Sequence, residues 1–187
     1  MNDSQSTEFT AFIGSRRLAS GPLDVVALAA KKAIDHGARQ SVLIYSDSTG
    51  RAIDIDHRGG DAEILARLAH PAPPPLPRGR GRPKLGVVAR EVTLLPRHWQ
   101  WLSSQPGGAS VAIRKLVETA RRANQDTDQR RQRQEAAYHF MSAMAGNLPN
   151  FEEASRALFA NEPERFNDLV AGWPGDVRDH AVKLAFA

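Results

Sequence analysis

Seven residues near the middle of the chain, Pro71–Pro77, contain five prolines. Proline fixes φ and has no backbone N–H, so it cannot continue a helix or occupy the interior of a sheet. A run this dense is typical of an extended polyproline segment, which rises about 3.1 Å per residue and holds its neighbours apart. The sequence therefore predicts a linker over residues 71–86 that separates an N-terminal domain from the rest of the 187-residue chain.

Positive charge is concentrated after the start of this linker. Residues 71–134 hold 13 Lys and Arg against 4 Asp and Glu, a net charge of +9, whereas residues 1–70 carry −1 and residues 135–187 carry −4. This asymmetry indicates a segment that binds a polyanion, and a solvated basic linker is the alternative reading. The chain has no cysteine, which excludes disulfides, thiolate metal sites and cysteine nucleophiles.

Short strand patterns and helix patterns alternate in the first 70 residues. The expected strands are Phe9–Ile13, Arg16–Ala19, Val42–Tyr45 and Ala52–Asp56. A helix is expected from Pro22, where a missing N–H costs nothing, to about Gly37, and a short one covers about Asp61–Ala69. We therefore expect residues 1–70 to form a small α+β domain built on a ββαββ unit.

The basic run after the prolines, Arg78-Gly79-Arg80-Gly81-Arg82-Pro83-Lys84, resembles an AT-hook. The narrow minor groove of A·T-rich DNA has an enhanced negative potential that attracts inserted arginines. Gly81, which lacks a Cβ, lets the backbone approach the groove, and Pro83 directs the chain away from it. The resemblance implies contact with A·T-rich DNA, and a disordered basic linker is the alternative.

Residues 87–123 have the order strand, proline, helix, glycine turn, helix, which resembles the ribbon–helix–helix DNA-binding fold. We expect a strand over Val87–Leu95, a helix over Pro96–Ser104, and a second helix capped by Ser110. In that family, the strands of two chains pair into a ribbon that enters the major groove, and the second helix holds a phosphate at its N-terminus. The resemblance implies a homodimer.

Together, the two resemblances imply a set of DNA-contacting residues. The set comprises Arg78, Arg80, Gly81, Arg82, Pro83, Lys84, Arg90, Thr93, Arg97, Ser110 and Arg114. One departure from the ribbon–helix–helix pattern is that neither face of the expected strand is cleanly polar, and Glu91 would be repelled by phosphate. The strand pairs either between chains or with the N-terminal sheet, and an αα-hairpin without a DNA role is the alternative.

Residues 124–187 are expected to form an acidic helical module. Apolar positions recur at helical spacing, and Pro149, Pro163 and Pro174 mark the breaks between helices. With its ββαββ head, basic centre and the segment Trp173-Pro174-Gly175-Asp176-Val177-Arg178-Asp179-His180, the whole chain also resembles an uncharacterised bacterial family. That likeness implies no activity.

No pattern in the sequence indicates an enzyme. The six histidines lack metal-ligand spacing, so we expect no catalytic residue, no metal and no cofactor. No stretch is apolar enough for a signal peptide or a membrane span, so a cytoplasmic protein located at the nucleoid is expected. The favoured function is a dimeric transcriptional regulator or nucleoid-associated protein, with a protein or effector partner for the N-terminal domain. The alternative is a non-enzymatic protein–protein adaptor.

Overall fold

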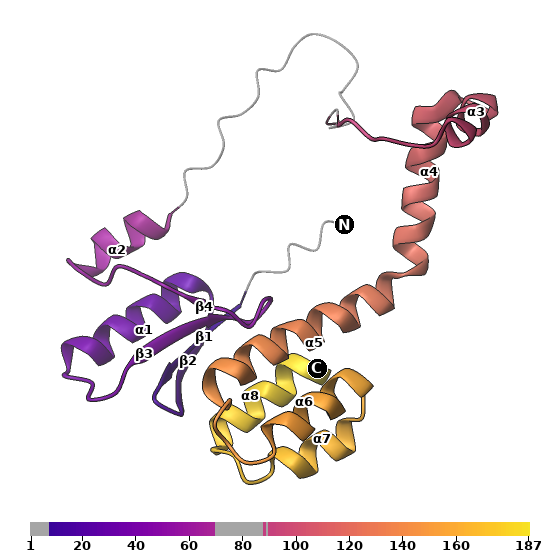
Figure 1. Cartoon of the computed structure of the whole chain (residues 1–187). Helices are drawn as coiled ribbons and strands as arrows, with labels where there is room; N and C mark the ends of the chain where they lie inside the picture. Colours follow the sequence, from indigo (N-terminus) through magenta and orange to yellow (C-terminus); the bar gives the residue numbers. More distant parts are fainter. Residues whose placement is uncertain (1–7, 70–87, 89) are drawn as a thin grey trace. The chain divides into compact units, whose positions relative to one another are not determined.

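The computed structural model describes residues 8–69, 88 and 90–187 (Figure 1). The chain divides into two compact units: unit 1 combines Met1–His70 with Thr127–Ala187, and unit 2 is Pro71–Asp126. The described elements are β1 (Phe9–Ile13), β2 (Arg16–Gly21), α1 (Leu23–Asp35), β3 (Val42–Ser46), β4 (Ala52–Ile53), α2 (Asp61–Leu68), α3 (Pro96–Ser104), α4 (Gly108–Ala123), α5 (Gln125–Met144), α6 (Phe151–Ala160), α7 (Pro163–Val170) and α8 (Gly175–Phe186). The expected α+β class is confirmed.

In unit 1, the described strands form a four-stranded antiparallel sheet with the order β2-β1-β3-β4. β1 pairs with β2 through the predicted hairpin, where Gly14 has a φ of 55°. A register shift between Ala11 and Phe12 marks an irregularity in that pairing. The predicted ββαββ order and the short helix α2 are confirmed, although β4 ends at Ile53 rather than at Asp56.

The sheet is apolar on both faces, because successive side chains of a strand point to opposite sides. Ala11 of β1 and Ile44 of β3 pack with Val26 and Ala30 of α1 on one face. The next residues along, Phe12 and Tyr45, belong to a second cluster with helices of the C-terminal part. Figure 1 shows α1 on one side of the sheet and the C-terminal helices on the other.

This second face joins two segments that the sequence analysis treated as separate domains. The rings of Phe12 and Tyr45 lie 5.4 and 5.1 Å from the ring of Phe140 in α5. Phe12, Tyr45 and Phe140 are all at most 1% exposed, and the cluster continues through Leu158, Phe166 and Val177. Residues 8–69 and 127–187 therefore share one core, because the apolar sheet face needs a cover that the N-terminal segment cannot provide.

The turn between β3 and β4 is fixed against α5 by a close backbone approach. Gly50 has a φ of 65°, and a Cβ placed on it would lie 1.7 Å from the carbonyl oxygen of Ala136. Only glycine fits such a position without strain or displacement of the helix. One residue on, the Arg51 guanidinium lies 3.0 Å from Nε2 of His139, which also belongs to α5.

Unit 2 contains the helical hairpin expected after the linker. α3 begins at Pro96 and ends at Ser104, as predicted, and Gly107, with a φ of 86°, turns the chain into α4. One expectation is wrong in detail. The N-cap of α4 is Gly107 rather than Ser110, because the glycine turn lets the helix begin at Gly108. Residue 88 and residues 90–95 pair with no strand among the described residues of this chain, so their pairing between two chains stays a prediction.

The polar stretch at the start of α5 is helical. Residues 125–134 form the first half of a separate 20-residue helix, in keeping with the helical module expected over residues 124–187. Among the described residues, no helix combines the length and the apolar character needed to cross a membrane.

Candidate functional site

The expected DNA-contacting residues fall into two groups with respect to the structure. Arg78, Arg80, Gly81, Arg82, Pro83 and Lys84 lie outside the described residues. Arg90, Thr93, Arg97, Ser110 and Arg114 are described, and all five are exposed in unit 2. Ser110 is the third residue of α4, so it lies in the first turn of the helix that it was expected to cap.

An open apolar groove occupies the hairpin of unit 2. The groove has a volume of about 390 Å³ and is lined by Val92, Leu94, His98, Trp101, Leu102, Ile113, Leu116 and Val117. Trp101 and Val117 are 52% and 60% exposed. Among the described residues of this unit, Leu102 and Ala112 are the buried apolar side chains. A folded domain normally buries far more apolar surface than this, so unit 2 exposes an unusually large share of its apolar side chains.

The residues before α3 alternate in their relation to this apolar groove. Val92 and Leu94 line it, whereas Thr93 between them does not. This alternation has the period of two that is expected of a strand, although no strand forms in the single chain. Neither Thr93 nor Arg90, both expected to contact DNA, lines the groove.

Some of the basic side chains of unit 2 already have partners in the protein. Arg121 and Arg122 each contact the Glu118 carboxylate at 2.9 Å. The hydrogen bond from Arg121 holds the pKa of Glu118 below its usual value. Arg114 donates from Nε to the carbonyl oxygen of Ser110 at 3.1 Å.

The remaining basic groups are free to meet a ligand. Within the part of the chain that the structure describes, Arg90, Arg97 and Lys115 are exposed and make no hydrogen bond or ion pair. These three cations are therefore the groups in the described part of unit 2 that can approach a phosphate without first breaking a contact.

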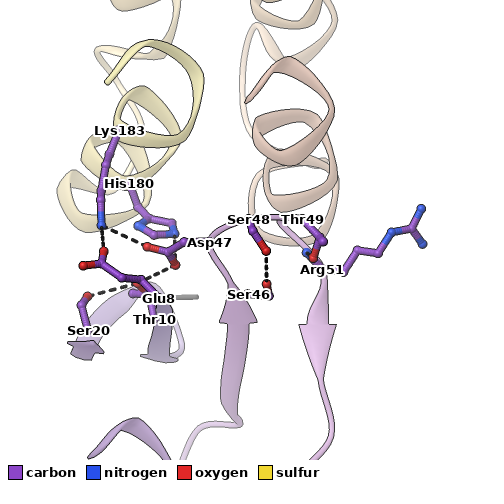
Figure 2. Close-up of polar contacts among 10 residues, drawn as sticks. All are labelled: Glu8, Thr10, Ser20, Ser46, Asp47, Ser48, Thr49, Arg51, His180 and Lys183. Atoms are coloured by element: carbon purple, nitrogen blue, oxygen red, sulfur yellow. Dashed lines mark hydrogen bonds and ion pairs between the residues drawn. The ribbon is translucent and has the colours of Figure 1, made fainter. Parts of the chain in front are cut away.

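Unit 1 contains a second notable site, a partly buried polar cluster where β1 and the end of β3 meet α8 (Figure 2). Thr10 is wholly buried and donates its hydroxyl to Asp47 Oδ1 at 2.9 Å. Lys183 donates from Nζ to Asp47 Oδ2 and to Glu8 Oε2, each at 3.0 Å. The backbone N–H of Asp47 donates to the carbonyl oxygen of Glu8 at 2.9 Å. The polar cluster therefore ties the sheet to the last helix.

His180 completes the polar cluster and is the most unusual of its members. It is 1% exposed, and its ring lies 5.4 Å from that of Phe12 and 4.6 Å from that of Phe140. Nε2 lies 3.6 Å from Asp47 Oδ1, and neither ring nitrogen has a hydrogen-bond partner among the described residues. Burial lowers the pKa of His180 to about 4 although Asp47 opposes the shift, so the ring is neutral at pH 7.

Lys183 contributes the ammonium of the polar cluster. Burial disfavours the ammonium of Lys183, but its hydrogen bonds to Asp47 and Glu8 outweigh that effect and raise its pKa. No local pattern in the sequence indicates this cluster, because Asp47 and Lys183 are 136 positions apart in the chain. A local signal for a covering element was present in the largely apolar strands β1 and β3, which indicate burial on both faces.

The described residues contain no group of three or more His, Cys, Asp or Glu that could hold a metal ion. The class of protein defined by these observations is a mixed α+β chain whose three-layered unit, a sheet between α1 and the C-terminal helices, is interrupted in sequence by a basic helical hairpin. The chain belongs to the family described as an uncharacterized protein conserved in bacteria (DUF2239), which matches residues 8–185. No curated protein and no solved structure matches it. The expected likeness to an uncharacterised bacterial family is confirmed.

Proposed function

We propose that the protein binds DNA as a homodimer through unit 2. In this proposal, the segment before α3 pairs with its copy in a second chain and enters the major groove, and the AT-hook-like residues 78–84 contact an adjacent minor groove. Such a protein would act at the nucleoid as a transcriptional regulator or as an architectural protein.

The observation that carries the proposal is the combination of an open apolar groove with an extended segment that has no strand partner. Val92 and Leu94 contribute apolar side chains from that segment, and Leu116 and Val117 contribute them from α4. A second copy would supply both the missing backbone partner and the missing apolar cover. The segment without a strand partner and the open apolar groove lie in the same part of unit 2, so one second copy would supply both a partner and a cover.

The unpaired cations of unit 2 support DNA as the ligand of this dimer. Arg90, Arg97 and Lys115 would give six positive groups in two chains. Each neutralised phosphate contributes about −0.9 to the slope of log affinity against log salt, so six contacts give a slope of about −5. Contacts from the AT-hook-like segment would make the slope steeper.

Fluorescence anisotropy with the full chain, using A·T-rich and G·C-rich duplexes at several salt concentrations, tests this proposal. Replacing Arg97 and Lys115 together by Gln should weaken binding to both duplexes and reduce the magnitude of the salt slope. Replacing Arg80 and Arg82 together by Ala should weaken binding to the A·T-rich duplex more than to the other. Arg39→Gln, a change of an exposed arginine in unit 1, is the matched control and should have no effect.

The same apolar groove also favours a second candidate, a protein–protein adaptor. An adaptor would place a segment of another protein between α3 and α4 and would use the basic residues for solubility alone. A full chain that is monomeric at micromolar concentration in light scattering and has a salt slope near zero would contradict DNA binding and favour the adaptor.

A further inference from the structure

A polar pocket of about 300 Å³ opens in unit 1 between α5, α8 and the turn after β3. Its floor includes Asp47 and Ser48 from the turn, and Ala136 and Leu184 contribute apolar surface. Three long polar side chains of α5, those of Gln129, Gln132 and Arg133, complete the lining. The volume is at the small end of the range for ligand sites in proteins.

The floor of this pocket is held in place from several directions. Asp47 is bonded to Thr10 of β1 and to Lys183 of α8, and its side chain is 10% exposed. The hydroxyls of Ser48 and Ser46 lie 3.0 Å apart, and Gly50 packs directly against the backbone of α5. Figure 2 shows the turn residues between the two helices. A floor fixed in this way does not have to be ordered by a ligand, which lowers the cost of binding.

The wall on α5 is different, because its polar side chains are exposed and have no partner among the described residues. Gln129, Gln132 and Arg133 are spaced at i, i+3 and i+4, so they lie on one face of the helix. Within the described residues, none of the three makes a hydrogen bond or an ion pair, and all are exposed. The guanidinium of Arg133 offers paired donors that suit a carboxylate, and the two amides add further donors.

Groups of opposite charge line the two sides of the pocket. At the floor, Asp47 supplies a carboxylate, one oxygen of which accepts a hydrogen bond from Lys183 at 3.0 Å. At the wall, Arg133 supplies one positive charge. The two hydrogen bonds that Asp47 accepts from side chains leave some of its roughly four acceptor positions for a donor in the pocket.

We propose that this pocket binds a small zwitterion of the α-amino acid type. The ligand's carboxylate would pair with Arg133 and the amides of Gln129 and Gln132, and its ammonium would donate to Asp47 and Ser48. Ala136 and Leu184 would contact its aliphatic part. The site lies wholly within unit 1, so its test does not depend on DNA binding by unit 2.

The proposal is tested on the full chain by thermal unfolding with each of the twenty protein L-amino acids at 10 mM, followed by calorimetric titration of those that stabilise it. At least one should raise the unfolding midpoint by about 3 °C relative to sodium chloride of the same concentration. Its N-acetyl derivative, which lacks the ammonium, and its amide, which lacks the carboxylate, should each bind at least about tenfold more weakly.

A pair of matched variants locates the binding. Arg133→Gln should weaken the same amino acid at least about tenfold, because it removes the charge that pairs with the carboxylate. Arg130→Gln changes an exposed arginine of the same helix outside the pocket and should leave affinity unchanged. The proposal is overturned if no amino acid shifts the midpoint, if the two charge-deficient derivatives bind as well as the parent, or if the two variants bind equally.

Discussion

The two units of this chain use their apolar side chains in opposite ways. In unit 1, Phe12, Phe140 and Phe166 are wholly buried, and the sheet is covered on both faces. In unit 2, Trp101 and Val117 are more than half exposed around an open groove. The contrast shows that unit 1 buries its large apolar side chains within itself, whereas unit 2 leaves several of its own exposed around the groove.

The test of this contrast with the largest expected effect is to separate the two segments of unit 1, residues 1–70 and 127–187. A fragment of residues 1–70 leaves the face of Phe12 and Tyr45 without its cover, so we expect it to lack cooperative urea unfolding, as followed by circular dichroism. Mixing it with a fragment of residues 127–187 should restore a cooperative transition. If the fragment of residues 1–70 unfolds cooperatively by itself, the shared core is not what stabilises the sheet.

A deletion that removes unit 2 provides the complementary control. Joining residues 1–70 to residues 127–187 through a flexible Gly/Ser linker retains both faces of the sheet and the polar cluster. This shortened chain should unfold cooperatively with a stability close to that of unit 1 in the full chain, because no residue of its core is missing. The same deletion should abolish DNA binding if unit 2 carries it.

Local structure could largely be predicted from the sequence. The strand Phe9–Ile13, the helix after Pro22 and the helix Pro96–Ser104 each have a period or a boundary residue that is visible within a short window. The α+β class follows from such elements. The predicted end of β4 at Asp56 and the predicted N-cap at Ser110 were wrong, since the structure has them at Ile53 and Gly107. Element boundaries depend on strand pairing and turn geometry more than on propensity.

Long-range association could not be predicted in the same way. The alternation of Ala11 with Phe12 in β1 indicates two buried faces, but not which segment covers the second face. Contact between Asp47 and Lys183 brings together residues 136 positions apart, and no sequence motif connects them. The candidate pocket on α5 was missed for a related reason, since its polar residues look like an ordinary solvated helix face until Asp47 is placed beside them.

The second test measures how the buried ring of His180 lowers the stability of the folded chain in acid. Its pKa is about 4 in the folded chain and about 6.5 when unfolded, because burial disfavours the charged ring. Below pH 6.5, the unfolded chain therefore takes up a proton that the folded chain does not, and stability falls as the pH decreases. Linkage gives a loss of about 3 kcal/mol in the free energy of unfolding between pH 7 and pH 4.

The variant His180→Phe isolates this effect, because it keeps an aromatic ring beside Phe12 and Phe140 but cannot bind a proton. Urea unfolding of both proteins across this pH range should show a steeper loss of stability for the natural chain. Carboxylates other than Asp47, which lies 3.6 Å from the ring, are common to both proteins, so their contribution cancels in the difference. Parallel stability curves would mean that His180 does not control the acid response.

The smallest expected effect comes from a valine in the open groove, and it tests the contrast most directly. Val117 is 60% exposed in α4, so Val117→Ala should change the free energy of unfolding of the main transition by less than about 0.5 kcal/mol in a monomeric sample. Val170→Ala makes the same change at a wholly buried position in unit 1, where the loss should be about 2 kcal/mol. Urea unfolding of both variants at several protein concentrations measures this difference.

If a second copy covers the apolar groove, the effect of Val117→Ala should grow with protein concentration, whereas that of Val170→Ala should stay constant. Only Val117 would then lie at an interface between two chains. Equal losses for the two variants at low concentration would mean that the groove is already closed within the single chain.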